Sequence, residues 1–161
     1  MKSYSKKILN SLNLDIFKII SDASDDLKID TYVVGGFVRD LIINKTVKKD
    51  IDIMCVGSGI DLAKAVQEKI NPKAKVSIFK RYGTAMVTFN DYQVEFVGSR
   101  KESYSNDSRN PSVEAGNFMD DMLRRDFTIN TLAIRLDKNK FGELVDTFGG
   151  LKAVSYTHLT L

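Results

Sequence analysis

The sequence has few of the residues that form cross-links or soft-metal sites. Its 161 residues include one cysteine, Cys55, one histidine, two prolines and no tryptophan. One cysteine excludes an internal disulfide, and the single histidine offers no zinc-like cluster. No apolar run reaches the length of a membrane span, and residues 1–13 mix lysine with serine instead of forming a signal peptide. We therefore expect a protein of the reducing cytoplasm with no membrane partner.

The remaining composition is that of an ordinary folded protein. Hydrophobic residues make up 43% and charged residues 28%, which argues against a disordered or fibrous chain. The length suits one domain with a sizeable core. A net charge of +3 and a pI near 8.9 permit binding to a polyanion such as nucleic acid without requiring it.

Hydrophobic periodicity predicts interspersed helices and strands. Apolar residues recur at three- and four-residue intervals in segment 14–27, which favours an amphipathic helix. Strand-like segments lie at 31–34, 51–56, 75–79, 84–89 and 93–97. Further helices are expected at 37–42, 59–70 and 127–132, a long polar loop at 99–117, and a polar turn at 137–140 between residues 133–136 and 143–145. The predicted fold is α/β (α+β), with a mixed, partly antiparallel sheet flanked by helices.

Two aspartates, Asp50 and Asp52, stand out at the start of the expected strand 51–56. Alternate residues of a strand face the same side, so the two carboxylates project together. Neighbouring carboxylates repel unless a cation lies between them, and Mg²⁺ prefers such oxygen ligands. As an isolated pattern, however, Asp-x-Asp more often ends a loop or caps a strand, so the pair needs independent support.

That support comes from the glycine pair Gly35 and Gly36, between an expected strand and an expected helix. Bare backbone amides and a helix N-terminus bind phosphate at such turns, although a Gly-Gly pair alone is more often just a tight turn. Arg39, one turn into the helix, offers a guanidinium fork for phosphate, or else pairs with Asp40 or Asp26. Together with the aspartates, these features predict metal-assisted phosphoryl or nucleotidyl transfer.

The motif Val-Gly-Gly-Phe-Val-Arg-Asp at 34–40, followed by Asp-Ile-Asp at 50–52, resembles the signature of the DNA polymerase β-type nucleotidyltransferase superfamily. More narrowly, the chain resembles the bacterial class II branch, which contains CCA-adding tRNA nucleotidyltransferases and poly(A) polymerases. The similarity covers residues 30–152 and continues through Lys-Arg-Tyr-Gly-Thr-Ala at 80–85, Val-Glu-Phe at 94–96, Arg-Lys-Glu-Ser-Tyr at 100–104, Arg-Asn-Pro at 109–111 and Arg-Arg-Asp-Phe-Thr-Ile-Asn at 124–130.

The resemblance implies a role for each matching residue. It implies metal ligands at Asp50 and Asp52, a third catalytic carboxylate at Glu95, nucleotide contacts at Gly35, Gly36, Arg39 and Arg125, and phosphate or ribose contacts at Arg100 and Arg109. Three alternatives stay open from the residues themselves. Glu95 is equally well read as a solvated strand residue, each loop arginine as a solubilising charge, and Asp126 as a salt-bridge anchor for its helix.

The resemblance also implies an activity and a domain plan. We expect the head of a template-independent RNA nucleotidyltransferase that adds the 3′ CCA end to tRNA from CTP and ATP, with two Mg²⁺ ions and release of pyrophosphate. A bacterial poly(A) polymerase is the alternative, and a fragment that binds nucleotide or RNA without turnover is a further one. Residues 1–29 are expected to form a helical lead-in, 30–152 the head, and 153–161 a tail that does not continue the family's base-selecting helix.

Overall fold

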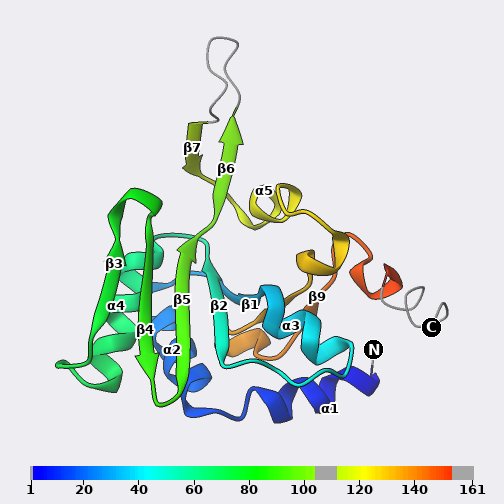
Figure 1. The fold of residues 1–161 in the computed structure, drawn as a ribbon, viewed down its shortest axis with the longest axis horizontal. Coiled ribbons are helices and arrows are strands. Elements are labelled where there is room, and N and C mark those ends of the chain that lie inside the picture. The colour runs from blue at the N-terminus through cyan, green and yellow to red at the C-terminus, as the bar shows by residue number, and fades with distance from the viewer. Residues whose placement is uncertain (1, 104–111, 154–161) are drawn as a thin grey trace.

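The computed structural model describes residues 2–103 and 112–153 (Figure 1). The helices are α1 (Lys2–Ser11), α2 (Asp15–Leu27), α3 (Gly35–Ile42), α4 (Gly59–Ile70) and α5 (Phe118–Leu123), with 3₁₀ turns η1 (Lys80–Tyr82), η2 (Thr128–Thr131) and η3 (Lys138–Lys140). The strands are β1 (Thr31–Val34), β2 (Asp50–Cys55), β3 (Val76–Phe79), β4 (Thr84–Phe89), β5 (Tyr92–Gly98), β6 (Arg100–Ser103), β7 (Ser112–Ala115), β8 (Ala133–Arg135) and β9 (Leu144–Val145).

Seven of these strands form one sheet in the order β3-β4-β5-β2-β1-β8-β9. Strands β2 and β5 are parallel, and the other neighbouring pairs are antiparallel. The remaining two strands, β6 and β7, form a separate ribbon that projects from the body of the molecule (Figure 1). The predicted mixed, partly antiparallel sheet is therefore confirmed.

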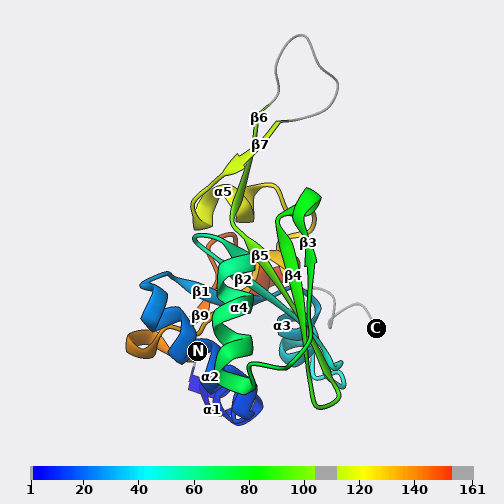
Figure 2. The same ribbon diagram turned by 90° about the vertical axis from the view of Figure 1, so that its left-hand side faces the viewer.

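One face of the sheet carries the main hydrophobic core. Along β2, Ile51, Ile53 and Cys55 are buried in a cluster that also contains apolar residues of α1, α2, α3 and α4. Helix α4 packs against β4 and β5, and α2 packs against α4 (Figure 2). Because strand side chains alternate between faces, Asp50, Asp52 and Met54 of β2 point to the other side.

The second face is covered over only part of its area. A smaller cluster joins Tyr32, Met54 and Ala133 of the sheet to Met122 of α5. This cover lies over β1, β2 and β8, towards the carboxyl end of β2. The amino-terminal half of β2 and the face of β4 and β5 beside it therefore form an open face, which carries polar side chains.

Two expectations about local structure were wrong, and one helix was not predicted. Segment 99–117 is not simply a loop, since β6 and β7 pair antiparallel from Arg100↔Ala115 to Ser103↔Ser112. These strands are almost entirely polar and show no apolar alternation that would reveal them in the sequence. Segment 127–132 contains the short 3₁₀ turn η2 instead of an α-helix. Helix α5, which directly follows the expected loop and was not predicted, begins at a capping box between Asn117 and Asp120.

Two further expectations concern residues that the structure does not describe. Arg109 and residues 154–161 lie outside the described residues, so the predicted loop contact and the predicted tail are not described structurally. Within residues 2–103 and 112–153, every helix is too short or too polar to cross a membrane.

Candidate active site

Three carboxylates gather on the open face, where the parallel strands β2 and β5 lie side by side (Figure 1). Asp52 is in register with Glu95, and Asp50 with Gln93. Residues in register on neighbouring strands face the same side, so Glu95 lies beside the aspartate pair. Asp50 and Glu95 are exposed and Asp52 is half-buried. The expected adjacency of the Glu95 strand and the aspartate strand is confirmed; the catalytic role of Glu95 stays a prediction.

The glycine turn lies directly against this cluster. Val34, the last residue of β1, is in register with Asp52, so the chain turns into α3 immediately beside the Asp52 carboxylate. Gly35 has a φ of +71°, and a Cβ at this position would lie 2.5 Å from Oδ2 of Asp52. Only glycine adopts this conformation readily and leaves the carboxylate in place. The turn therefore presents bare backbone next to Asp52, as a cradle for a phosphate chain would require.

Arg39 lies near the same turn but is paired within its own helix. A Cβ on Gly36 would lie 3.6 Å from Nη2 of Arg39. The guanidinium donates through Nε and Nη2 to Oδ1 of the buried Asp40, at 2.9 and 2.8 Å. The alternative partner Asp26 instead binds Lys69 at 2.6 Å. Two of the five N–H groups of Arg39 are therefore directed at Asp40, and the others remain for a phosphate.

A buried carboxylate that sequence reasoning missed holds the two arginines after α5. Asp121 is fully buried and accepts from Nε and Nη2 of Arg125 at 2.9 and 2.8 Å through Oδ2. Its Oδ1 accepts from Nε and Nη2 of Arg124 at 3.0 and 2.9 Å, and from the backbone amide of Arg100 at 3.3 Å. The spacing of Asp121 to its two arginines, three and four residues along a helix, was the available sequence signal. Asp126, for which a salt-bridge role was one of the open alternatives, is exposed.

The electrostatics connect Arg125 to the carboxylate cluster. Burial, followed by the negative charges of Glu95 and Asp50, raises the pKa of Asp52, while Arg125 acts in the opposite direction. Arg125 is thus close enough to stabilise the ionised form of Asp52. The remaining repulsion among the three carboxylates favours a cation between them.

The donor set fits Mg²⁺ shared with a phosphate ligand. Asp50 and Asp52 provide hard oxygen donors on one side of β2. Among the described residues, no three histidine, cysteine or acidic side chains already converge on one point as a complete metal cage. Mg²⁺ is usually held by only one or two carboxylates together with substrate phosphates and water, so a pair of aspartates beside a phosphate cradle is sufficient.

The other singled-out residues lie away from the carboxylates. Arg100 begins β6 and donates through Nη2 to the backbone carbonyl of Tyr82, so it links the ribbon to η1. Cys55 is buried in the core, and burial raises the pKa of its thiol to about 12. This confirms the expectation of an inert core thiol.

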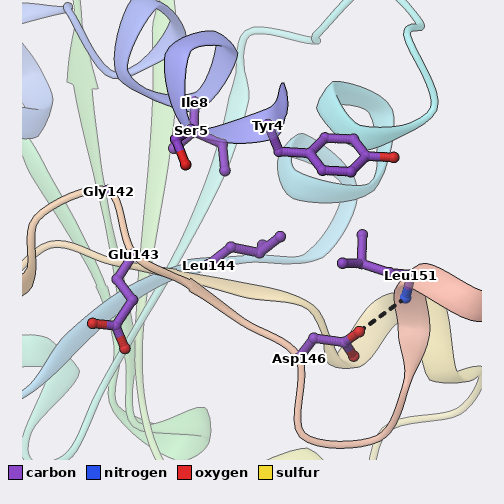
Figure 3. A pocket seen from close by; sticks show the side chains of 8 residues that line it. All are labelled: Tyr4, Ser5, Ile8, Gly142, Glu143, Leu144, Asp146 and Leu151. Atoms are coloured by element: carbon purple, nitrogen blue, oxygen red, sulfur yellow. Dashed lines mark hydrogen bonds between the residues drawn. The ribbon is translucent and has the colours of Figure 1, made fainter. Parts of the chain in front are cut away.

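A separate hollow of about 430 Å³ lies between α1 and the β9 edge of the sheet (Figure 3). Its charged lining residues are Glu143 and Asp146, and the Asp146 carboxylate is turned to the backbone amides of Gly150 and Leu151, at 2.6 and 3.1 Å. Strands β1 and β8 separate it from β2. An acidic lining this far from the aspartate pair is unsuited to a triphosphate.

A family model described as the poly A polymerase head domain matches residues 31–160. The chain belongs to this family. The family assignment made from the motifs is therefore confirmed, and solved head structures of the family share the observed fold.

Relatives of this head domain carry tRNA-modifying names. The chain is 37% identical over 134 residues to the A-adding tRNA nucleotidyltransferase of Geobacter sulfurreducens, which covers 83% of this chain and 15% of that protein. It resembles a solved tRNA nucleotidyltransferase complexed with a primer tRNA and an incoming ATP analogue (TM-score 0.72, 32% identity, 84% of this chain and 36% of that one). It also resembles a CCA-adding enzyme in an apo form (TM-score 0.83, 29% identity, 94% and 36%). The chain thus spans well under half the length of these proteins.

Proposed function

We propose that this chain is the catalytic head of a template-independent RNA nucleotidyltransferase that adds nucleotides from CTP and ATP to the 3′ end of tRNA. The observation that carries the proposal is the contact between the Gly35 turn and the Asp52 carboxylate, in register with Glu95. This contact supports a single site, in which the Gly35 turn would bind phosphate and Asp50 and Asp52 would bind metal. The names of the relatives supply the class of substrate.

In the proposed reaction, one side of the site binds the metal ions and the triphosphate, and the other side activates the primer hydroxyl. Asp50 and Asp52 would hold two Mg²⁺ ions, which neutralise phosphate charge and polarise the reacting oxygens. The amides of Gly35 and Gly36 bind the triphosphate with Arg39 and Arg125, as donors fixed before the substrate arrives.

On the other side of Asp52, Glu95 accepts the proton of the primer hydroxyl, which lies within reach of β5. The 3′ oxygen forms a new bond to the α-phosphorus of the nucleotide. The bond from that phosphorus to the β-phosphate oxygen breaks, and pyrophosphate leaves. The reaction would take place in the cytoplasm, where a tRNA substrate is available.

The nucleotide order is the finer part of the proposal. Relatives of this head include A-adding and CCA-adding enzymes, so the same fold serves different additions. We propose CCA addition as the activity and poly(A) addition as the second candidate, because the family description includes poly A polymerases.

The direct test incubates the full-length gene product with labelled CTP or ATP and tRNA that lacks its 3′ CCA end. We expect CMP to be incorporated first and AMP afterwards, and we expect Asp52→Ala to abolish both. Asp91→Ala, in the β4–β5 turn, is the matched control and retains activity. A single AMP added only to tRNA that already ends in CC would make the protein A-adding, and an AMP homopolymer would favour the polymerase.

The chain itself provides a simpler test. We expect it to bind CTP or ATP in the presence of Mg²⁺ and to lose that binding when the metal is chelated. Binding by the chain without incorporation would favour the third alternative, a nucleotide-binding fragment. Absence of metal-dependent binding would contradict the proposed phosphate cradle.

A further inference from the structure

The sheet edge farthest from the glycine turn carries exposed aromatic and basic side chains. Phe79 at the end of β3 is 44% exposed, and Tyr82 in η1 is 61% exposed. Lys80 and Arg81 between them are also exposed. The Arg81 guanidinium carbon lies 5.8 Å from the centre of the Tyr82 ring. We name residues 79–82 the β3 edge surface.

The β3 edge surface begins, at Phe79, on the face that carries the carboxylates, and continues through η1 to the end of the sheet beside the start of α4. Phe79 is in register with Thr84, Thr84 with Val97, and Val97 with Met54. Asp52 precedes Met54 by two residues and therefore faces the same way. In Figure 1, β3, β4, β5 and β2 lie next to one another in this order.

The geometry of the proposed reaction relates the β3 edge surface to the path of the RNA primer. In nucleotidyl transfer the attacking hydroxyl and the leaving pyrophosphate lie on opposite sides of the α-phosphorus. The phosphate cradle at Gly35 lies on the β1 side of Asp52, whereas Glu95 lies on the β5 side. The primer strand must therefore approach over β5, β4 and β3, and the β3 edge surface lies along that approach.

A hollow beside the edge has the size and charge for a nucleotide. Its volume is about 430 Å³, within the range of ligand pockets. Arg81 and Arg100 supply positive charge, and Glu114 is the only acidic side chain among the described residues that line the hollow. Arg100 donates to the carbonyl of Tyr82, so two walls of the hollow are already tied together.

We propose that the β3 edge surface is the docking site for the single-stranded RNA primer, with a base stacked on Tyr82 and a backbone phosphate held by Arg81. Aromatic side chains interleaved with cations are the usual means of binding single strands, because every base has a face that stacks. A disordered peptide partner would not need the cationic charge, and the match between this charge and the RNA phosphates favours RNA. The direction of the strand rests on the proposed function, whereas RNA binding at this edge does not.

The experiment measures the affinity of the full-length gene product for a fluorescein-labelled, single-stranded RNA oligonucleotide by anisotropy, over a range of salt concentrations. Tyr82→Ala is expected to weaken binding about 5- to 100-fold without changing the salt dependence. Arg81→Ala is expected to reduce the slope of log K against log salt by about 0.7, as for one lost phosphate contact. Leu27→Ala and Lys64→Ala, exposed positions on the helices that cover the other face, are the matched controls and bind RNA normally.

Metal-dependent CTP binding, measured on the same variants, separates this inference from the proposed function. We expect CTP binding and thermal stability to be unchanged in Tyr82→Ala and Arg81→Ala. Wild-type RNA affinity in both variants would overturn the docking site even where CTP binds normally. Loss of RNA binding in both, in a protein that binds no CTP, would support the docking site and contradict the proposed function. Equal competition by a fully paired duplex would overturn the stacking role of Tyr82.

Discussion

Replacement of Gly35 by alanine tests how closely the proposed phosphate cradle lies against Asp52, the proposed metal ligand. The new Cβ would lie 2.5 Å from Oδ2 of Asp52, whereas ordinary contact begins at 3.4 Å. The carboxylate must therefore move by roughly 1 Å, and displacements of that size at a reacting centre cost about 100-fold in rate. The φ of +71° adds a conformational penalty of roughly 1–2 kcal/mol for any L-residue.

Gly149 provides a matched control for the conformational penalty of a side chain at positive φ. Its φ is +73°, and a Cβ there would have nothing within 4 Å. Gly149→Ala should therefore lose about 1–2 kcal/mol of stability, or roughly 2–8 °C in melting temperature, and keep its activity. Gly35→Ala should lose at least as much stability and, in addition, its metal-dependent nucleotide binding and about 99% of its nucleotide incorporation.

The assay compares thermal unfolding, CTP binding with Mg²⁺ and nucleotide incorporation for both variants. The difference between the variants isolates the contact with Asp52, because the backbone penalty is common to both. Retention of nucleotide binding and activity by Gly35→Ala at the level of Gly149→Ala would refute the claim that the turn and the carboxylate form one site.

The remaining predictions concern three buried or half-buried groups. Asp121→Ala should destabilise the protein by roughly 3 kcal/mol in urea unfolding, because it leaves two guanidinium groups without their carboxylate; a loss near zero would contradict this. The raised pKa of Asp52 means that the folded state holds its proton more tightly, so stability falls as pH rises from about 3.8 through the folded pKa. Asp52→Asn should therefore melt at a higher temperature than wild type at neutral pH, with the difference disappearing below pH 3.8; a difference independent of pH would contradict it. Cys55 should resist alkylation at neutral pH until the protein unfolds, and rapid labelling of the folded protein would disprove its burial.

Local periodicity predicted the elements that have both a buried face and clear end signals. The predicted helix 59–70 coincides with α4, which stops at Asn71 before Pro72. The predicted strand 84–89 coincides with β4, and Asn90, with a φ of +52°, makes the expected turn into β5. In these segments the apolar pattern and the turn residues agree, so local information was sufficient.

Prediction of the β6–β7 ribbon and of the short helices would have required information that the local sequence does not carry. Strands β6 and β7 pair with each other outside the main sheet, so no buried face imposes an apolar alternation on them. Helix α5 spans six residues, too few for a recognisable period. Its capping box at Asn117 was nevertheless a usable sign of a helix start.

The parts of the candidate site whose residues are close together in the sequence could be predicted from it. The parts that combine distant residues could not. The aspartate pair and the glycine turn form two compact motifs, and both lie at the centre of the site. The register of Asp52 with Glu95 depends on a parallel pairing between distant strands, which one sequence does not reveal. Asp121 was missed although its spacing of three and four residues to two arginines was a usable signal, because its burial and its ion pairs are seen only in the structure.

The ion pairs of the site suggest how its arginines act on a nucleotide. Arg39 and Arg125 are each held by a carboxylate that is itself buried, Asp40 and Asp121. Neither guanidinium therefore has to be ordered when a triphosphate binds, so the entropic cost of fixing two long side chains is met during folding. The same carboxylates reduce the net positive charge that the phosphates would meet. A site built in this way gains orientation more than attraction, which would suit the proposed activity, in which pyrophosphate is released after every addition.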